Sequence, residues 1–118
     1  MQYMLLIYED ENVLREPPVI QEVVAAHMRL AAELREKGVL VAGDGLQTSD
    51  TATTVRYNAA GRSVHDGPFP ETREQLGGYY LIDVPNLDEA TKWAARCPSA
   101  AWGSIELRPL GMTPETRS

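Results

Sequence analysis

The chain is poor in the residues that mark several protein classes. Only one of its 118 residues is a cysteine, Cys97, so no disulfide can form within the chain, and we expect a reducing, cytoplasmic setting. No apolar run approaches the roughly 20 residues that a membrane-spanning helix needs, so we expect no membrane partner. The 11 basic and 17 acidic residues give a net charge of −6. A negative surface repels phosphate backbones, so we expect no nucleic-acid partner.

Motifs for metals, cofactors and nucleotides are also missing. The only two histidines, His27 and His65, lie far apart, and no Cys/His spacing typical of a metal site occurs. There is no GxGxxG after a strand, no phosphate-binding loop and no G-x-S-x-G elbow. We therefore expect neither a bound metal nor a cofactor.

The residues that are present predict one soluble domain. Hydrophobic residues make up 43% and charged residues 24% of the chain, which is ordinary for a globular protein. We place a single domain at residues 1–111 and a loose, polar tail at residues 112–118.

Hydrophobic periodicity gives the order of the elements. Residues 3–8 form an apolar run rich in β-formers, and two prolines and a glycine bracket a helix over residues 17–38. Strands are predicted at 39–47, in a hairpin over 51–66 with Gly61 in its turn, at 79–84 and at 104–110. Residues 71–78 predict a short helical turn, and residues 86–97 a second helix with Asn86 as a reciprocal cap with Glu89.

This order is β-α-β, an inserted hairpin, then β-α-β, which is typical of a ferredoxin-like α+β fold. The runs at 3–8 and 79–84 are apolar on both faces of a strand. Two helices can cover only one face of the sheet. We expect a second copy of the chain to cover the other face, which makes the protein a homodimer.

His27 is the sharpest candidate for chemistry. It lies on a helical stripe with Ile20, Val23, Leu30 and Leu34. An imidazole titrates near neutrality, so His27 could act as a general base or acid at a cavity. It could equally be a partly buried histidine that bonds a backbone carbonyl. A catalytic role needs an orienting acceptor, and Asp44, Asp66 and Glu71 lie on predicted turns.

The segment after the hairpin is the second candidate region. Asp66 begins an Asp-Gly-Pro turn, and Phe69, the only phenylalanine, follows it directly. Glu71 and Arg73 precede a Gly-Gly pair that allows close backbone approach. The segment could form a pocket wall in which Phe69, Glu71 and Arg73 bind substrate, with Arg73 holding a carboxylate. A common Asp-Gly turn and solvated surface charges are the plainer interpretation.

The stretch "DGPFPETREQLGGYYLIDV", with "YMLLIY", the helical His27, "GVLVAGDGL" and "LDEATKWAARCP", resembles the YCII-related domain family and in particular its DGPF subgroup. The resemblance implies a dimeric α+β barrel and an active site built around a histidine, here His27, with a nearby aspartate. The wider family's pattern favours Asp44 as that aspartate, and the subgroup's favours Asp66.

The resemblance leaves two functions open. Related barrels include isomerases, dehalogenase-like enzymes and monooxygenases of small aromatic compounds, which implies cofactor-independent acid–base chemistry on a small-molecule ligand. Genes of the subgroup often neighbour sigma factors, which implies instead a ligand-sensing or partner-binding module without turnover. A carboxylate within about 3.2 Å of an imidazole nitrogen, facing a cavity, would favour the enzyme. A His27 bonded only to main chain would favour a structural role.

Overall fold

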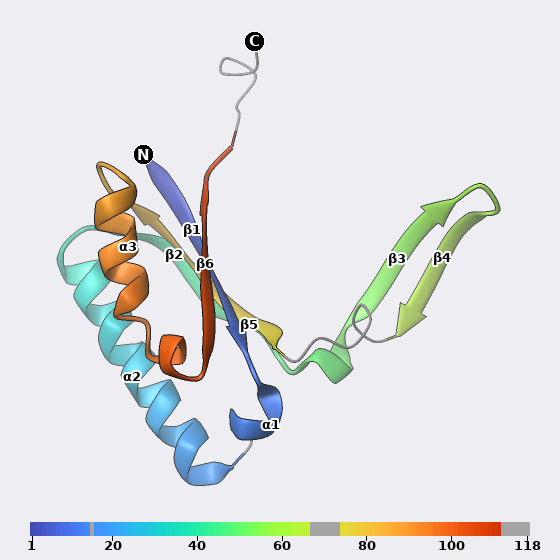
Figure 1. Ribbon diagram of the computed structural model, residues 1–118, viewed down its shortest axis with the longest axis horizontal. Coiled ribbons are helices and arrows are strands. Elements are labelled where there is room, and N and C mark those ends of the chain that lie inside the picture. Colours follow the sequence, from blue (N-terminus) through green and yellow to red (C-terminus); the bar gives the residue numbers. More distant parts are fainter. Residues whose placement is uncertain (15, 67–73, 112–118) are drawn as a thin grey trace.

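A computed structural model describes residues 1–14, 16–66 and 74–111, with the backbone alone at residues 14, 65 and 66. Its centre is an antiparallel four-stranded sheet with strand order β2-β5-β1-β6 (Figure 1). The strands are β1 (Gln2–Glu9), β2 (Leu40–Gly45), β5 (Gln75–Asp83) and β6 (Gly103–Pro109). The helices α2 (Pro17–Glu36) and α3 (Leu87–Ala95) cover one face of this sheet. The mixed α+β architecture agrees with the ferredoxin-like prediction.

The core lies between this sheet face and the two helices. Alternate residues of β1 are buried, because successive side chains of a strand point to opposite faces. The core is formed by aliphatic and aromatic side chains of the sheet and both helices: Tyr3, Leu5, Ile7, Leu30, Leu34, Tyr80, Ile82, Val84, Ala90, Trp93, Ala94 and Cys97.

Helix α2 forms where the sequence predicts it. Pro17 and Pro18 occupy its first turn, and Gly38 follows its end with φ 69°, a left-handed conformation that favours glycine. Within the predicted stripe, Val23, Leu30 and Leu34 are buried. Ile20 is 43% exposed, so the first turn of α2 extends beyond the core.

Several local predictions need correction. Gln75 to Gly78 are strand, not a helical turn, because β5 begins at Gln75 and pairs with β1 and β2. Sequence periodicity did not reveal the single-turn helix α1 (Glu11–Leu14) or the 3₁₀ helices η1 (Ser49–Thr51) and η2 (Pro98–Ala101), which are too short to show it. At α3, the Asn86 side chain accepts from the Glu89 N–H as predicted. The Glu89 carboxylate instead pairs with Lys92 at 3.1 Å.

The inserted hairpin consists of β3 (Thr53–Asn58) and β4 (Gly61–Asp66), which form a separate two-stranded sheet. Gly61 has φ 113° and pairs with Asn58 across the turn, as the sequence predicts. In Figure 1 the hairpin projects from the sheet on the side away from α2 and α3.

Within residues 1–14, 16–66 and 74–111, no helix covers the sheet face opposite α2 and α3 (Figure 1). Strand register places Leu6 beside Tyr79 and Met4 beside Leu81 on this face. These apolar side chains are only half-buried. None of the helices in the described part of the chain is both long and apolar enough to span a membrane.

Candidate functional site

A pocket of about 420 Å³ lies beside α2 at the end of β1, and we call it the α2 pocket. Its walls come from α2, the β1–α1 junction, the end of β2 with the loop after it, and the start of β5. The lining residues are Ile7, Glu9, Glu11, Ile20, Val23, Val24, His27, Met28, Ala31, Gly43, Asp44, Gly45, Leu46, Gln47, Thr48, Gly77, Gly78, Tyr79 and Tyr80. The exposed first turns of α2 therefore form an apolar wall, with Ile20, Val24 and Met28 facing the cavity.

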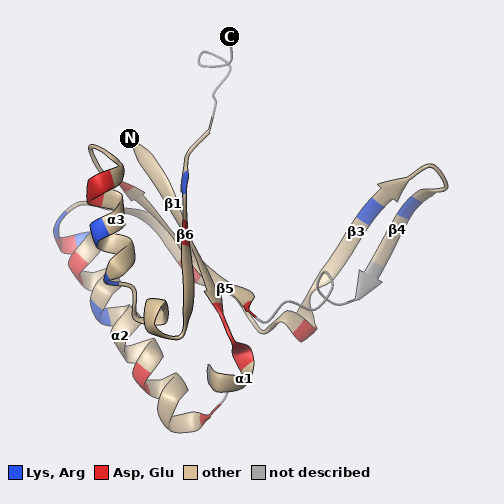
Figure 2. Ribbon diagram, viewed as in Figure 1, with Lys and Arg blue, Asp and Glu red and all other residues tan. Residues whose placement is uncertain are grey.

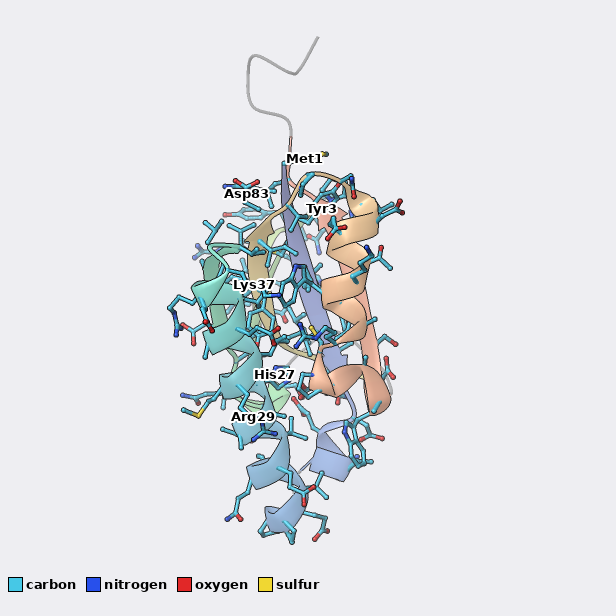
Figure 3. All side chains as sticks on the ribbon, turned by 90° about the vertical axis from the view of Figure 1, so that its left-hand side faces the viewer. Met1, Tyr3, His27, Arg29, Lys37 and Asp83 are labelled. Carbon is cyan, nitrogen blue, oxygen red and sulfur yellow. The ribbon has the colours of Figure 1, made fainter. Side chains whose placement is uncertain are left out.

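His27 projects from the side of α2 that faces the sheet (Figure 3). Both of its ring nitrogens bond side chains. Nδ1 lies 2.8 Å from the Tyr80 hydroxyl of β5. Nε2 lies 2.8 Å from Ser99 Oγ of η2. Ser99 Oγ in turn donates to Glu9 Oε1 over 2.6 Å. Four side chains from four elements thus form one continuous hydrogen-bond chain along the pocket.

The single proton of each hydroxyl fixes the direction of this chain. Ser99 donates to the Glu9 carboxylate, so the Ser99 oxygen accepts from Nε2–H of His27. In the neutral ring Nδ1 is then an acceptor, and Tyr80 donates to it. If the ring is charged, Nδ1–H donates to the Tyr80 oxygen, and the Tyr80 hydroxyl turns to the backbone carbonyl of His27, 3.3 Å away. The same groups therefore satisfy both charge states of His27.

Burial shifts the titration of both rings. It lowers the pKa of His27 by disfavouring the charged imidazolium. It raises the pKa of Tyr80 to about 12, so this hydroxyl stays protonated at neutral pH. His27 is therefore neutral near pH 7, and its Nδ1 accepts a hydrogen bond from the Tyr80 hydroxyl, which keeps its proton.

Glu9 is the last member of the hydrogen-bond chain and lies at the end of β1, just before α1. A Cβ at residue 77 would lie 2.8 Å from Glu9 Oε2, so the carboxylate fits only because Gly77 has no side chain. Figure 2 shows that acidic residues gather at this junction. Glu11, also in the pocket lining, accepts from both the backbone and the hydroxyl of Ser49, which ties η1 to α1.

The predicted carboxylate partners of His27 have other positions. Asp44 belongs to the pocket lining, but its Oδ1 accepts from the Gly45 N–H at 3.1 Å. The Asp66 backbone pairs with Thr53 in the hairpin, and its side chain lies outside the described residues. Phe69, Glu71 and Arg73 lie outside them as well. The two criteria set from the sequence were a direct carboxylate partner for the ring and bonds to main chain only, and His27 meets neither. Its ring nitrogens bond two hydroxyls, and the Glu9 carboxylate is linked to the ring through the Ser99 hydroxyl.

Sequence reasoning missed Glu9, Tyr80 and Ser99. Tyr80 and Ser99 are 53 and 72 residues from His27 in the chain, and no spacing motif connects them. Ser99 is fully buried, in a 3₁₀ turn that begins at Pro98. The signal that could have found it is this proline, which directly follows the predicted helix at residues 86–97 and favours the first turn of a new one. The described residues contain no group of three or more metal-ligating side chains.

The comparisons with known proteins agree on the family and the fold. The family model of the YCII-related domain matches residues 1–111. The chain belongs to the YCII-related domain family. It is 37% identical to an uncharacterized protein from Rhizobium meliloti, over 95% of this chain and 94% of that protein.

A solved structure with the same fold extends the comparison. It is the 5-chloro-2-hydroxyhydroquinone dehydrochlorinase from Burkholderia phenoliruptrix in complex with 2,5-dihydroxybenzoquinone. The TM-score is 0.54 at 10% identity, and 98% of each chain is covered. At this identity the likeness concerns the fold alone.

Proposed function

We propose that this YCII-related protein is a cofactor-independent enzyme that performs acid–base chemistry on a small ring compound in the α2 pocket. The observation that carries the proposal is the chain Tyr80–His27–Ser99–Glu9, which lines or adjoins the pocket and satisfies both charge states of the imidazole. A site that holds both states can take up and return a proton at little cost in reorganisation.

The pocket favours a neutral, ring-sized ligand. Its volume of about 420 Å³ lies within the range of small-molecule sites. Glu9, Glu11 and Asp44 are in its lining, and Lys and Arg are absent from the lining among the described residues. Arg73 remains our candidate for binding an anionic substituent, with Phe69 and Glu71 beside it in sequence, and Asp44 or Asp66 remains a further candidate for the acid–base site.

The reaction class that we propose is dehydrochlorination or isomerisation. The fold neighbour named above is a dehydrochlorinase. Dehydrochlorination is the loss of one proton and one chloride ion, and isomerisation moves one proton, so both need the acid–base group that the pocket supplies. The ligand of the neighbour is a single hydroxylated ring, which is also the size that we propose here.

The test is turnover of 5-chloro-2-hydroxyhydroquinone under anaerobic conditions, followed by chloride release. We expect the wild type to release chloride and His27→Leu to lose at least about 100-fold in rate, the usual contribution of a positioned acid or base. His65→Leu, the same change at the other histidine, is the control and should retain the wild-type rate. Equal rates for all three proteins, or no chloride release by the wild type, would contradict the proposal.

One observation favours a second candidate, a ligand-sensing or partner-binding module. Both ring nitrogens of His27 already bond protein groups, as in a ring that shapes a pocket without reacting. Under this alternative, hydroquinone would stabilise the wild type and His27→Leu equally in a thermal-shift assay, and neither would turn over a substrate. A sigma factor would then be the partner to examine by co-purification.

We also propose assignments that reach beyond the family. The "DGPF" motif at residues 66–69 supports placement in the DGPF subgroup. The buried thiol of Cys97 supports a cytoplasmic location. The uncovered sheet face supports a homodimer with the barrel arrangement of two facing sheets.

A further inference from the structure

We infer that Glu9 is the catalytic residue that exchanges a proton with the ligand, and that Ser99 and His27 are positioning residues behind it. The inference rests on the proposed acid–base function and names the atom that performs it. It assigns to Glu9 a role that the sequence analysis proposed for His27.

Both nitrogens of the His27 ring are occupied by protein groups. Each nitrogen lies 2.8 Å from a hydroxyl, so a ligand can reach a nitrogen only by displacing Tyr80 or Ser99. Tyr80 is 7% exposed and Ser99 is 0% exposed. Both are anchored in the core, and neither can swing away without opening the packing between sheet and helices.

Only one carboxylate oxygen of Glu9 bonds another side chain among the described residues. Oε1 accepts from Ser99, whereas Oε2 has no hydrogen-bond partner among the described residues. Oε2 lies beside Gly77, and both residues line the α2 pocket. The missing side chain at residue 77 leaves room for this oxygen itself, in a residue that lines the cavity. A carboxylate oxygen with unused lone pairs in a pocket is a ready proton acceptor.

The hydrogen-bond chain from His27 through Ser99 orients the Glu9 carboxylate. Nε2–H of His27 points at the Ser99 oxygen, so the Ser99 hydroxyl must point at Oε1. This bond holds the carboxylate in one rotamer and directs its second oxygen to the ligand. Tyr80 acts on the other side of the ring, where it keeps Nδ1 occupied.

The proton transfer balances without a further reactant. A ligand O–H or C–H bond breaks, its proton bonds to Oε2, and the negative charge passes from the carboxylate to the ligand. The ligand anion then either expels chloride, for a net loss of HCl, or takes the proton back at another atom, for an isomerisation. Glu9 is regenerated when it returns the proton to water or to the ligand.

The test compares Glu9→Gln with Glu11→Gln in chloride release from 5-chloro-2-hydroxyhydroquinone. Both variants remove one carboxylate from the same pocket lining. Glu11, however, bonds Ser49 and does not belong to the hydrogen-bond chain of Tyr80, His27, Ser99 and Glu9. We expect Glu9→Gln to lower kcat at least about 100-fold with KM changed less than about threefold, and Glu11→Gln to lose under about tenfold.

A second comparison separates positioning from direct catalysis at residue 27. His27→Gln keeps an N–H donor for Ser99, whereas His27→Leu keeps none. If His27 only positions, the glutamine variant retains at least about tenfold more activity than the leucine variant. If both lose activity equally while Glu9→Gln stays active, His27 itself meets the ligand. The proposed function then stands and the inference is overturned.

An NMR titration of His27 gives a readout that does not need turnover. Under this inference we expect the Glu9 carboxylate to stabilise the imidazolium through Ser99, so Glu9→Gln and Ser99→Ala should each lower the pKa of His27 by about half a pH unit or more. Glu11→Gln should change it much less. If the wild type releases no chloride, the proposed reaction is wrong. If the pKa of His27 is unchanged in Glu9→Gln, the inference about Glu9 is overturned, whether or not chloride is released.

Discussion

At the scale of single residues, His27 shows how one polar side chain on an apolar stripe can organise a site. It sits between the buried Val23 and Leu30 on α2, and a neutral polar group there needs partners for every donor and acceptor. Tyr80 and Ser99 supply these partners, and the Glu9 carboxylate accepts the hydrogen bond from Ser99 at the end of the hydrogen-bond chain. The imidazole is therefore held in place and kept titratable.

Burial of His27 should make stability depend on pH. Burial lowers the pKa of the folded-state ring, so the unfolded chain binds more protons between the ordinary value of 6.5 and the lowered one. Stability should therefore fall as pH drops through this window and be unaffected by His27 above it. Urea unfolding at pH 7.5 and 5.5 should show a larger loss for the wild type than for His27→Gln. Equal losses would show that the ring titrates alike in both states.

The sequence revealed His27 but not its partners, and the reason is physical. A polar residue that interrupts an apolar period of 3–4 is visible locally. Ser99 and Tyr80 are brought to it by the packing of η2 and β5, across 72 and 53 residues of chain. Glu9 directly follows the apolar run at residues 3–8, and nothing in that run indicates a partner for it. Such partners follow from tertiary packing, which no window of sequence contains.

At the scale of elements, long periodic segments were predicted and short ones were not. Helix α2 and the β1, β2 and β6 strands occur where the apolar patterns placed them, since burial against the sheet selects those periods. The pattern at residues 71–78 predicts a short helical turn, yet its glycines at 77 and 78 lie within β5. The register of β5 against β1 shifts beside them, between the pairs of Ile7 and Tyr8, which marks an irregularity that glycine accommodates.

The two neighbouring glycines of β5 should respond differently to alanine. At Gly78 the new Cβ would lie 2.8 Å from the Asp44 backbone carbonyl oxygen, which cannot yield without breaking strand pairing. Gly78→Ala should cost roughly 1–3 kcal/mol of unfolding free energy. At Gly77 the contact is the far end of the Glu9 side chain, which can rotate, so Gly77→Ala should change stability by less than about 1 kcal/mol.

Activity should respond differently from stability, because Gly77→Ala should impair catalysis although it costs little stability. Gly77→Ala pushes the Glu9 carboxylate from its bond with Ser99, so chloride release should fall although the protein remains folded. Chemical denaturation measures the stability of both variants, and the chloride assay measures their activity. A Gly77→Ala variant with wild-type turnover would show that the rotamer of Glu9 is not critical.

At the scale of the whole molecule, the distribution of apolar surface is uneven. The helices cover one sheet face, whereas Met4, Leu6, Tyr79 and Leu81 lie half-buried on the other. The hairpin projects on this uncovered side and carries exposed apolar residues of its own, among them Tyr57, which is 77% exposed (Figure 1). A contiguous apolar face of this kind is typical of a surface that a partner covers.

We predict that a second copy of the chain covers this face and that a lysine there separates the copies. Multi-angle light scattering at micromolar concentration should give the wild type about twice the 13.0 kDa of one chain, because an obligate dimer buries roughly 2,000 Å² or more. Leu6→Lys and Leu81→Lys should each shift the mass toward one chain, since each would bury an unpaired ammonium between two sheets. Leu87→Lys is the matched control: Leu87 is 53% exposed at the start of α3, in the helical layer, and its replacement should leave the dimer intact. A wild type that remains monomeric, or a dimer that Leu87→Lys disrupts as readily as Leu6→Lys, would place the interface elsewhere or remove it.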